Sequence, residues 1–343
     1  MQAVTIGLDL AKTVFQVHGV DSQGKVVLVR QLRRGQIIEF FRKLAPCLVG
    51  MEACATAHYW ARELARLGHT VRLMPASYVK AYVKRSKTDA ADAAAICEAV
   101  TRPSMRFVPV KTGLQQAALM LHRGRDLLIR QRTQLINALR AHLAEIGLVA
   151  ATGVDGLKSL LIIVRESADT ERLPEPMRQA LQALVDQLAA LQVQIGTLER
   201  CVQAQHRSSE TSRRLETIPG IGVIGATAIA ATVTDPSAFR SGRELAAWIG
   251  LVPRQHSTGG KQKLGGISKQ GDRYLRRLLI VGATAVIRHA RVHPDKHPWL
   301  IKLLGKMPAK KVAVALANKM ARIAWAILAK GGTYQAPALA AAA

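Results

Sequence analysis

The order of strand and helix patterns over residues 4–99 limits the fold of this chain more than any other feature. Between residues 4 and 10, apolar residues alternate with Thr5, Gly7 and Asp9, which is the two-residue period of a strand. The chain then shows strand patterns at 14–20, 25–30, 47–51 and 71–74 and helix patterns at 36–44, 58–67 and from 89. Three strands linked by hairpins and then strands alternating with helices predict a mixed α/β sheet with helices on both faces.

Acidic residues stand near the ends of two of these strands. In the ribonuclease-H-like order that the pattern matches, the first and fourth strands are neighbours, so we expect Asp9 and Glu52 at one end of the sheet. Asp89 and Asp92 follow a basic run at 84–87, and residues three apart share one face of a helix. Four carboxylates held together repel one another unless a cation lies between them. Because Mg²⁺ prefers hard oxygen ligands, the sequence predicts a Mg²⁺ site.

Each of these carboxylates also has an ordinary structural explanation. Asp9 could be a turn residue at the end of a strand, and Glu52 could be a helix N-cap or a solvated carboxylate. Asp89 and Asp92 suit the positive end of a helix dipole, with Ser86 or Thr88 as a cap. The metal interpretation depends on all four occurring together at these places.

The chain is basic along its whole length. Its 343 residues contain 49 Lys and Arg against 23 Asp and Glu, a net charge of +26. This charge favours a polyanionic partner, with nucleic acid first and an acidic membrane surface second. The apolar run at 312–317 is broken by Asn318 and Lys319, so we expect no membrane span. The amino terminus has no charged n-region and the four cysteines form no C-x-x-C pair, which favours a reduced, cytoplasmic protein.

The middle of the chain has two helical patterns. The first, at 114–146, is strongly basic, and its arginines are either phosphate contacts or a solvated face. The candidate contacts there are Arg123, Arg125 and Arg130. In the second, apolar residues recur in steps of three and four between positions 181 and 202. This spacing favours helix pairing as in a coiled coil, including pairing between subunits, over one amphipathic helix packed on its own domain.

Two glycine-containing motifs follow. The run Ile218-Pro219-Gly220-Ile221-Gly222 has the pattern of a helix-hairpin-helix turn, in which Gly220 and Gly222 bring backbone N–H groups close to a phosphate; a plain packing corner is the alternative. Residues 253–277 form a Gly-rich basic loop and a basic helix, with hydroxyls at Ser257 and Thr258. The candidate phosphate contacts in this stretch are Arg254, Lys261, Lys263, Lys269 and Arg276.

Taken together, these motifs resemble the DEDD transposases of the insertion-sequence-110 family, which includes the Piv-type DNA invertases. The likeness covers nearly the whole chain and is carried by residues 7–12, 51–53, 87–92, 218–222 and 257–260. The stretch 250–277 looks most like the eleven-eleven branch. One departure is Ala53-Cys54-Ala55, where many relatives have Ala-Thr-Gly; it removes a glycine but no ligand.

The resemblance implies a RuvC-like DEDD domain (1–112), a helical coiled-coil region (113–205) and a C-terminal transposase domain (206–343). It implies site-specific recombination of donor and target double-stranded DNA, guided by a structured RNA from the element's non-coding end. Asp9, Glu52, Asp89 and Asp92 would hold Mg²⁺, and a serine would be the nucleophile. We also expect a homodimer or a dimer of dimers on nucleic acid, associated with the nucleoid.

For the nucleophile we choose Ser257 over Thr258. Thr258 directly precedes a glycine, as the serine of relatives does, but its branched Cβ crowds in-line attack at phosphorus. Ser268 is expected to be an N-cap or a phosphate contact. Two alternatives stay open: a RuvC-type Holliday-junction nuclease using metal-activated water, and a non-catalytic nucleic-acid-binding protein. A trapped covalent protein–DNA adduct would exclude both.

Overall fold

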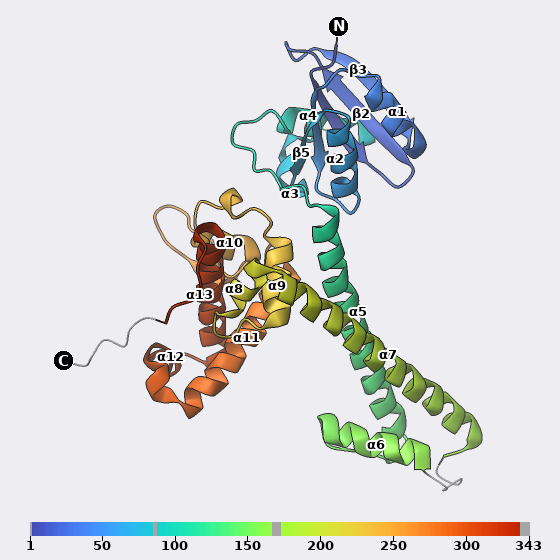
Figure 1. Ribbon diagram of the computed structural model, residues 1–343, viewed down its shortest axis with the longest axis vertical. Helices are drawn as coiled ribbons and strands as arrows, with labels where there is room; N and C mark the ends of the chain where they lie inside the picture. Colours follow the sequence, from blue (N-terminus) through green and yellow to red (C-terminus); the bar gives the residue numbers. More distant parts are fainter. Residues whose placement is uncertain (1, 85–87, 167–172, 337–343) are drawn as a thin grey trace, which may run out of the picture. The chain divides into compact units, whose positions relative to one another are not determined.

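The chain folds into two units in the computed structural model, which describes residues 2–84, 88–166 and 173–336 (Figure 1). Unit 1 comprises Met1–Gln116 and Val233–Arg240, and unit 2 comprises Ala117–Thr232 and Ser241–Ala343. The boundary between them falls inside one helix, α5 (Gly113–Ala144).

Unit 1 is built on a mixed sheet whose strand order is β3-β2-β1-β4-β5. The strands are β1 (Thr5–Leu10), β2 (Val14–Val20), β3 (Val26–Arg33), β4 (Leu48–Glu52) and β5 (Thr70–Met74). The first three run antiparallel, whereas β1, β4 and β5 are parallel. The first and fourth strands are neighbours, as the order of patterns in the sequence predicted.

Helices cover both faces of this sheet, which confirms the predicted α/β class. They are η1 (Arg34–Gln36), α1 (Ile37–Arg42), α2 (Ala57–Arg66), α3 (Ala76–Val79), η2 (Lys80–Tyr82) and α4 (Asp89–Ala99), with η3 (Pro236–Ala238) in the second segment of the unit. Ile6 and Leu8 point into a core with Trp60 of α2. On the other face α4 lies directly on β1, because a Cβ atom on Gly7 would be 2.1 Å from the carbonyl oxygen of Ala93.

Unit 2 is mainly helical (Figure 1), and its described residues also include a small two-stranded hairpin. Besides α5, its helices are α6 (Val154–Glu166), α7 (Glu175–Ser208), α8 (Glu210–Glu216), α9 (Val223–Thr232), α10 (Gly242–Ile249), α11 (Arg273–Val292), η4 (Pro294–Lys296), α12 (Pro298–Leu304) and α13 (Ala309–Lys330). The hairpin strands are β6 (Pro253–Gln255) and β7 (Leu264–Ile267).

The apolar stripe of α7 is buried within its own chain. Leu181 and Leu188 share a core with Leu139 of α5 and Leu160 of α6. The spacing in the sequence was compatible with pairing of this stripe between subunits. In the structure, its residues from Leu181 to Leu188 pack against α5 and α6 of the same chain. The stripe therefore gives no support of its own for assembly.

Helix α13 is long and apolar enough to cross a membrane by length and composition alone. Its residues Val312, Leu316 and Met320 are buried, and the helix packs against α10 and α11. The apolar composition of α13 is therefore explained by its place in the core of unit 2.

Candidate active site and nucleic-acid interface

Asp9 and Glu52 lie at the same end and on the same face of the sheet. Gly7 of β1 is paired with Gly50 of β4 in parallel register, and both glycines face α4: a Cβ on Gly50 would be 2.8 Å from that of Val100. Because side chains two positions apart on a strand share a face, Asp9 and Glu52 point to the α4 side as well. Both are half-buried.

Helix α4 runs antiparallel to β1. The Cys97 thiol donates to the Thr5 carbonyl over 3.6 Å, and Ala93 lies over Gly7. Four residues of a helix advance about 6 Å and two residues of a strand about 6.6 Å, so four positions along α4 span nearly the same distance as two positions along β1. Asp89, one turn before Ala93, is therefore level with the carboxyl-terminal end of β1.

The first turn of α4 presents its two aspartates to that end. Thr88 caps the helix, its hydroxyl accepting from the Ala91 N–H at 3.2 Å. Asp89 is exposed and Asp92 half-buried. Residues 85–87, which belong to the preceding basic run and include the alternative cap Ser86, lie outside the described residues.

The four carboxylates share one region without forming a closed metal site. Within residues 2–84, 88–166 and 173–336, no three His, Cys, Asp or Glu side chains are grouped so that they could hold a metal ion. The backbone nevertheless brings Asp9, Glu52, Asp89 and Asp92 from three rigid elements to one end of the sheet. Carboxylate oxygens are the ligands that hard divalent cations prefer, so the residue types of this set suit such a cation.

Ser257 and Thr258 lie at the tip of the β6–β7 hairpin, where the sequence predicted only a loop. The Lys261 N–H donates to the Thr258 carbonyl at 3.0 Å, and Gly259 and Gly260 have φ values of 54° and 77°. Two central residues with positive φ define a type I′ turn, which matches the twist of a hairpin. The hairpin thus gives Ser257 a defined place on one arm, directly before the turn.

The surroundings of Ser257 are basic and open. Its hydroxyl accepts from the Lys263 N–H over a long 3.4 Å, and the predicted contacts Arg254, Lys261 and Lys263 are exposed on the same hairpin. Lys269, also exposed, follows it with a φ of 56°. These side chains could hold the phosphates on either side of a cut.

Arg276, predicted as a phosphate contact, has a structural position instead. It is 9% exposed, and its Nη1 donates to the carbonyls of Ile249 and Gln270, both at 2.7 Å. The guanidinium joins the end of α10 to the turn that follows the hairpin. A periodic basic helix gives no sign of which arginine turns inward, so the sequence could not separate Arg276 from its neighbours.

The three predicted phosphate contacts on α5 differ in their exposure and in their ion pairs. Arg123 and Arg130 are exposed, although Arg130 is 3.6 Å from Asp126. Arg125 is largely buried and donates twice to Glu199 of α7, at 2.9 and 2.6 Å. Arg123 is therefore the best placed of the three to meet a phosphate.

The two motif glycines have different surroundings. Gly220 has a φ of 88°, and a Cβ there would lie 2.8 Å from Val286 Cγ2 and 2.9 Å from the Gly282 carbonyl oxygen of α11. Gly222 is exposed, and nothing lies within 4 Å of its Cβ position. Gly220 thus serves close packing, whereas Gly222 leaves the start of α9 open to a ligand.

Sequence reasoning missed a buried polar contact between α5 and α11. His122 is 1% exposed, and its Nδ1 lies 3.2 Å from the Tyr274 hydroxyl. Burial lowers the pKa of His122 to about 4, and the nearby Arg125 charge adds to this. Burial also raises the pKa of Tyr274. No motif signals this pair, because its members are 152 positions apart.

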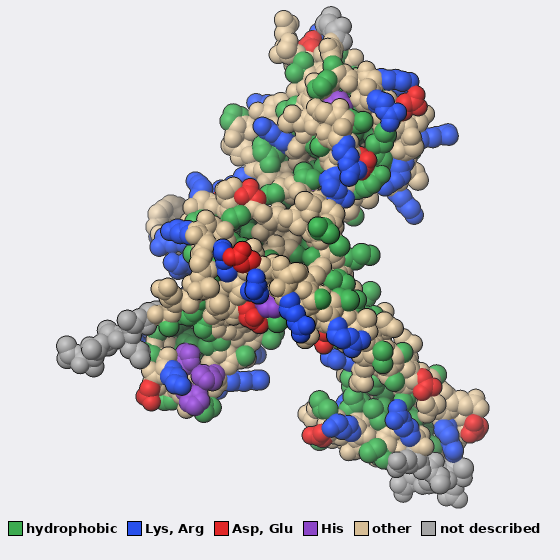
Figure 2. Space-filling view, viewed as in Figure 1, with side chains coloured by type: hydrophobic (Ala, Val, Ile, Leu, Met, Phe, Trp, Pro, Cys, Tyr) green, Lys and Arg blue, Asp and Glu red, His purple; other side chains and the backbone are tan. Residues whose placement is uncertain are grey.

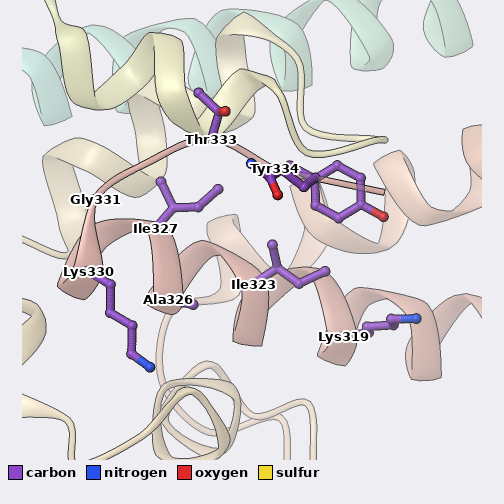
Figure 3. Close-up of a pocket in the computed structure, with 9 residues that line it drawn as sticks. Lys319, Ile323, Ala326, Ile327, Lys330, Gly331, Thr333 and Tyr334 are labelled. Carbon is purple, nitrogen blue, oxygen red and sulfur yellow. The ribbon is translucent and has the colours of Figure 1, made fainter. Parts of the chain in front are cut away.

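A groove of about 420 Å³ lies beside the end of α13 (Figure 3). Ile323 and Ile327 of α13 form part of its wall, and Tyr334 of the following segment closes one side. The described residues that line it include lysines but no carboxylate. The groove therefore lacks the groups of the candidate metal site.

Lys and Arg side chains are spread over the visible surface rather than gathered in one patch (Figure 2). Four carboxylates at one end of a sheet, in a chain with a net charge of +26, are features expected of an enzyme that acts on a nucleic-acid backbone. Two family models match this chain. One, described as "Transposase IS116/IS110/IS902 family", covers residues 212–298, and the other, a DEDD transposase domain of the IS110 type, covers residues 6–148.

Full-length relatives agree with these matches. The chain is 53% identical to a probable family 20 transposase of Pseudomonas aeruginosa, over 98% of this chain and 99% of that protein. It is 40% identical to the transposase for insertion sequence element IS1328 of Yersinia enterocolitica, over 96% and 98%. It is 41% identical to the transposase for IS1111A of Coxiella burnetii, over 96% and 91%.

The chain therefore belongs to the IS110 family of DEDD transposases. It is an insertion-sequence transposase, an enzyme that acts on DNA, and its DEDD domain indicates a divalent metal cofactor.

Proposed function

We propose that this transposase performs RNA-guided, site-specific DNA recombination with Mg²⁺ and a serine nucleophile. The observation that carries the proposal is the placement of Asp9, Glu52, Asp89 and Asp92 at one end of a sheet ordered β3-β2-β1-β4-β5. This order supports a RuvC-like domain, and the carboxylates are its metal ligands. When bound, Mg²⁺ polarises a scissile phosphate.

The nucleophile in this proposal is Ser257. Its hydroxyl gives up its proton as the oxygen forms a bond to phosphorus, the bond from phosphorus to one neighbouring nucleoside oxygen breaks, and that leaving oxygen takes up a proton, so no net proton is gained or lost. The Ser257–DNA linkage is itself a phosphodiester, so the free energy of the broken bond is conserved. A hydroxyl at the end of another DNA strand can later displace the serine without an external energy source. Arg254, Lys261 and Lys263 hold the flanking phosphates.

Two features of the hairpin favour Ser257 over Thr258. Ser257 is an exposed primary hydroxyl on the arm, directly before the turn. Thr258 is the first residue of the turn, its carbonyl is held by Lys261, and its Cβ is branched. Attack at phosphorus needs an unhindered line of approach.

The guide RNA and the assembly rest on the family resemblance and on charge. A net charge of +26 suits a complex with structured RNA as well as donor and target DNA. Recombination cuts several strands together, which favours a dimer or a dimer of dimers, acting in the cytoplasm at the nucleoid.

The test is an adduct assay on a denaturing gel. The protein is mixed with Mg²⁺, a labelled duplex carrying the element's junction, and RNA transcribed from the DNA that flanks the gene. We expect a covalent adduct with the wild type and with Thr258→Ala and Ser268→Ala, and none with Ser257→Ala. Loss in Thr258→Ala alone would move the nucleophile by one position. Cutting without any adduct would favour the junction-nuclease alternative, which uses water.

A further inference from the structure

Two contacts, one helical turn apart, join α5 to the start of α11. In the first, His122 Nδ1 faces the Tyr274 hydroxyl at 3.2 Å, with ring centroids 5.7 Å apart. In the second, Arg277 pairs with Asp126. Tyr274 and Arg277 are three positions apart, and His122 and Asp126 are four apart, so each pair lies on one helix face. These two contacts, one with a buried histidine and one at the surface, link one face of α5 to one face of α11.

The His122 contact is a poor choice for stability alone. Its Nε2 is buried without a hydrogen-bond partner among the described residues, and an unsatisfied buried nitrogen is unfavourable. An apolar side chain would fill this place without that penalty. A buried nitrogen without a partner therefore needs an explanation other than stability. One explanation is that the His122–Tyr274 hydrogen bond orients Tyr274, because a hydrogen bond fixes the orientation of its partner more closely than apolar packing does.

The same turn of α11 also anchors the hairpin. Arg276, between Tyr274 and Arg277, binds the carbonyls of Ile249 and Gln270. The base of the hairpin is closed by two backbone hydrogen bonds, from Ser268 N–H to the Val252 carbonyl at 2.8 Å and from Lys269 N–H to the Gly250 carbonyl at 3.2 Å.

Gly271 completes this base. It has a φ of 69°, and a Cβ atom there would lie 1.8 Å from the Trp248 carbonyl oxygen, so only glycine allows the turn to lie this close to the end of α10. The base of the hairpin is therefore held to both the end of α10 and the first turn of α11.

We propose that His122 and Tyr274 are positioning residues that orient the β6–β7 hairpin, and with it Ser257, on helix α5. The role of Ser257 rests on the proposed function, whereas the positioning of the hairpin does not. Neither residue touches the substrate: they act through α11.

The test compares two hydroxyl deletions in unit 2. Tyr274→Phe removes the hydroxyl that faces His122. The matched control is Ser212→Ala, because the buried Ser212 hydroxyl lies 2.8 Å from Nδ1 of His206, in a contact that joins α7 to α8. Amide hydrogen exchange of both variants is followed at Ser268, Lys269 and Leu275. In Tyr274→Phe we expect exchange there to be faster by about tenfold, the scale of one lost hydrogen bond, with α13 unchanged.

The second readout separates position from binding. With the junction duplex and flanking RNA, Tyr274→Phe should form the adduct about tenfold or more slowly at saturating DNA, while the DNA concentration for half-maximal rate stays within about twofold. His122→Phe should reproduce this loss. Ser212→Ala should show neither effect.

Exchange at the hairpin base no faster than in Ser212→Ala would overturn the proposal, and so would a loss of DNA affinity equal to the loss of rate. If the wild type itself forms no adduct, the proposed serine chemistry fails, and hydrogen exchange still decides the positioning.

Discussion

At the scale of single residues, Asp89 is a proposed metal ligand that contributes little to the fold. Asp89 is exposed at the first position of α4, where Thr88 already caps the helix. Asp89→Asn keeps the size of the side chain and removes one favourable charge–dipole interaction, about 0.3–1 kcal/mol. We expect an unchanged fold and no strand cleavage with Mg²⁺.

The control for Asp89→Asn is Glu98→Gln on the same helix. Glu98 pairs with Arg102 at 2.6 Å at the other end of α4, so its loss should leave cleavage intact. Circular dichroism and thermal unfolding would check the fold of both variants. Normal recombination by Asp89→Asn would exclude it as a metal ligand.

His122 gives a prediction for stability against pH. Burial lowers the pKa of His122 from 6.5 to about 4 in the folded protein, so the unfolded chain takes up the proton first as the pH falls. Its contribution, on the order of 3 kcal/mol, is complete above pH 6.5 and is lost between about pH 6.5 and 4. Urea unfolding at several pH values should show this loss in the wild type.

The informative quantity is the slope against pH rather than the stability itself. His122→Phe should unfold with a shallower dependence on pH over this range, whatever its stability at pH 7. The pKa values of His18 and His297 are also lowered by burial and act in the same direction, so some dependence remains. An unchanged slope in His122→Phe would mean that this histidine is protonated as readily in the folded chain as in the unfolded one.

At the scale of elements, helices and strands with a strong apolar period could be predicted from the sequence, whereas short exposed strands and most side-chain contacts could not. The strands that carry Asp9 and Glu52 alternate or are continuously apolar, so their positions follow from the sequence, and so does the neighbour relation of β1 and β4. The β6–β7 hairpin could not be predicted, because its strands have three and four mostly exposed residues and no alternation. The inward turn of Arg276 and the His122 contact depend on tertiary packing, which no local pattern encodes.

Whether the apolar stripe of α7 packs within one chain or between subunits can be tested. Leu188 is 2% exposed and Leu191 4%, and Leu188 packs with residues of α5 and α6 of the same chain. Replacing both by Asn should lower the free energy of unfolding by several kcal/mol and disrupt the packing of α5, α6 and α7 within the monomer. Val193, on the same helix and 64% exposed, supplies the control Val193→Asn. A stable, folded monomer that fails only to assemble would show that the stripe forms an interface between subunits.

At the scale of the whole molecule, charge governs binding. With +26 overall, affinity for DNA should fall steeply with salt, by roughly a thousandfold or more between 50 and 200 mM if six or more phosphates are contacted. Arg123→Gln should reduce the slope of log K against log salt by about one. Arg125→Gln should change the slope less, because Arg125 is held by Glu199. A salt-independent affinity would contradict the polyanion account.

The central claim, that a serine on the hairpin takes up the cut strand, is tested most directly by mapping the covalent adduct. The wild-type protein, Mg²⁺, junction duplex and flanking RNA are allowed to react. The mixture is then digested with protease and nuclease, and the peptide carrying a nucleotide is sequenced by mass spectrometry. We expect one modified site, Ser257. A nucleotide on any other residue, or cleaved DNA with no modified peptide, would contradict it.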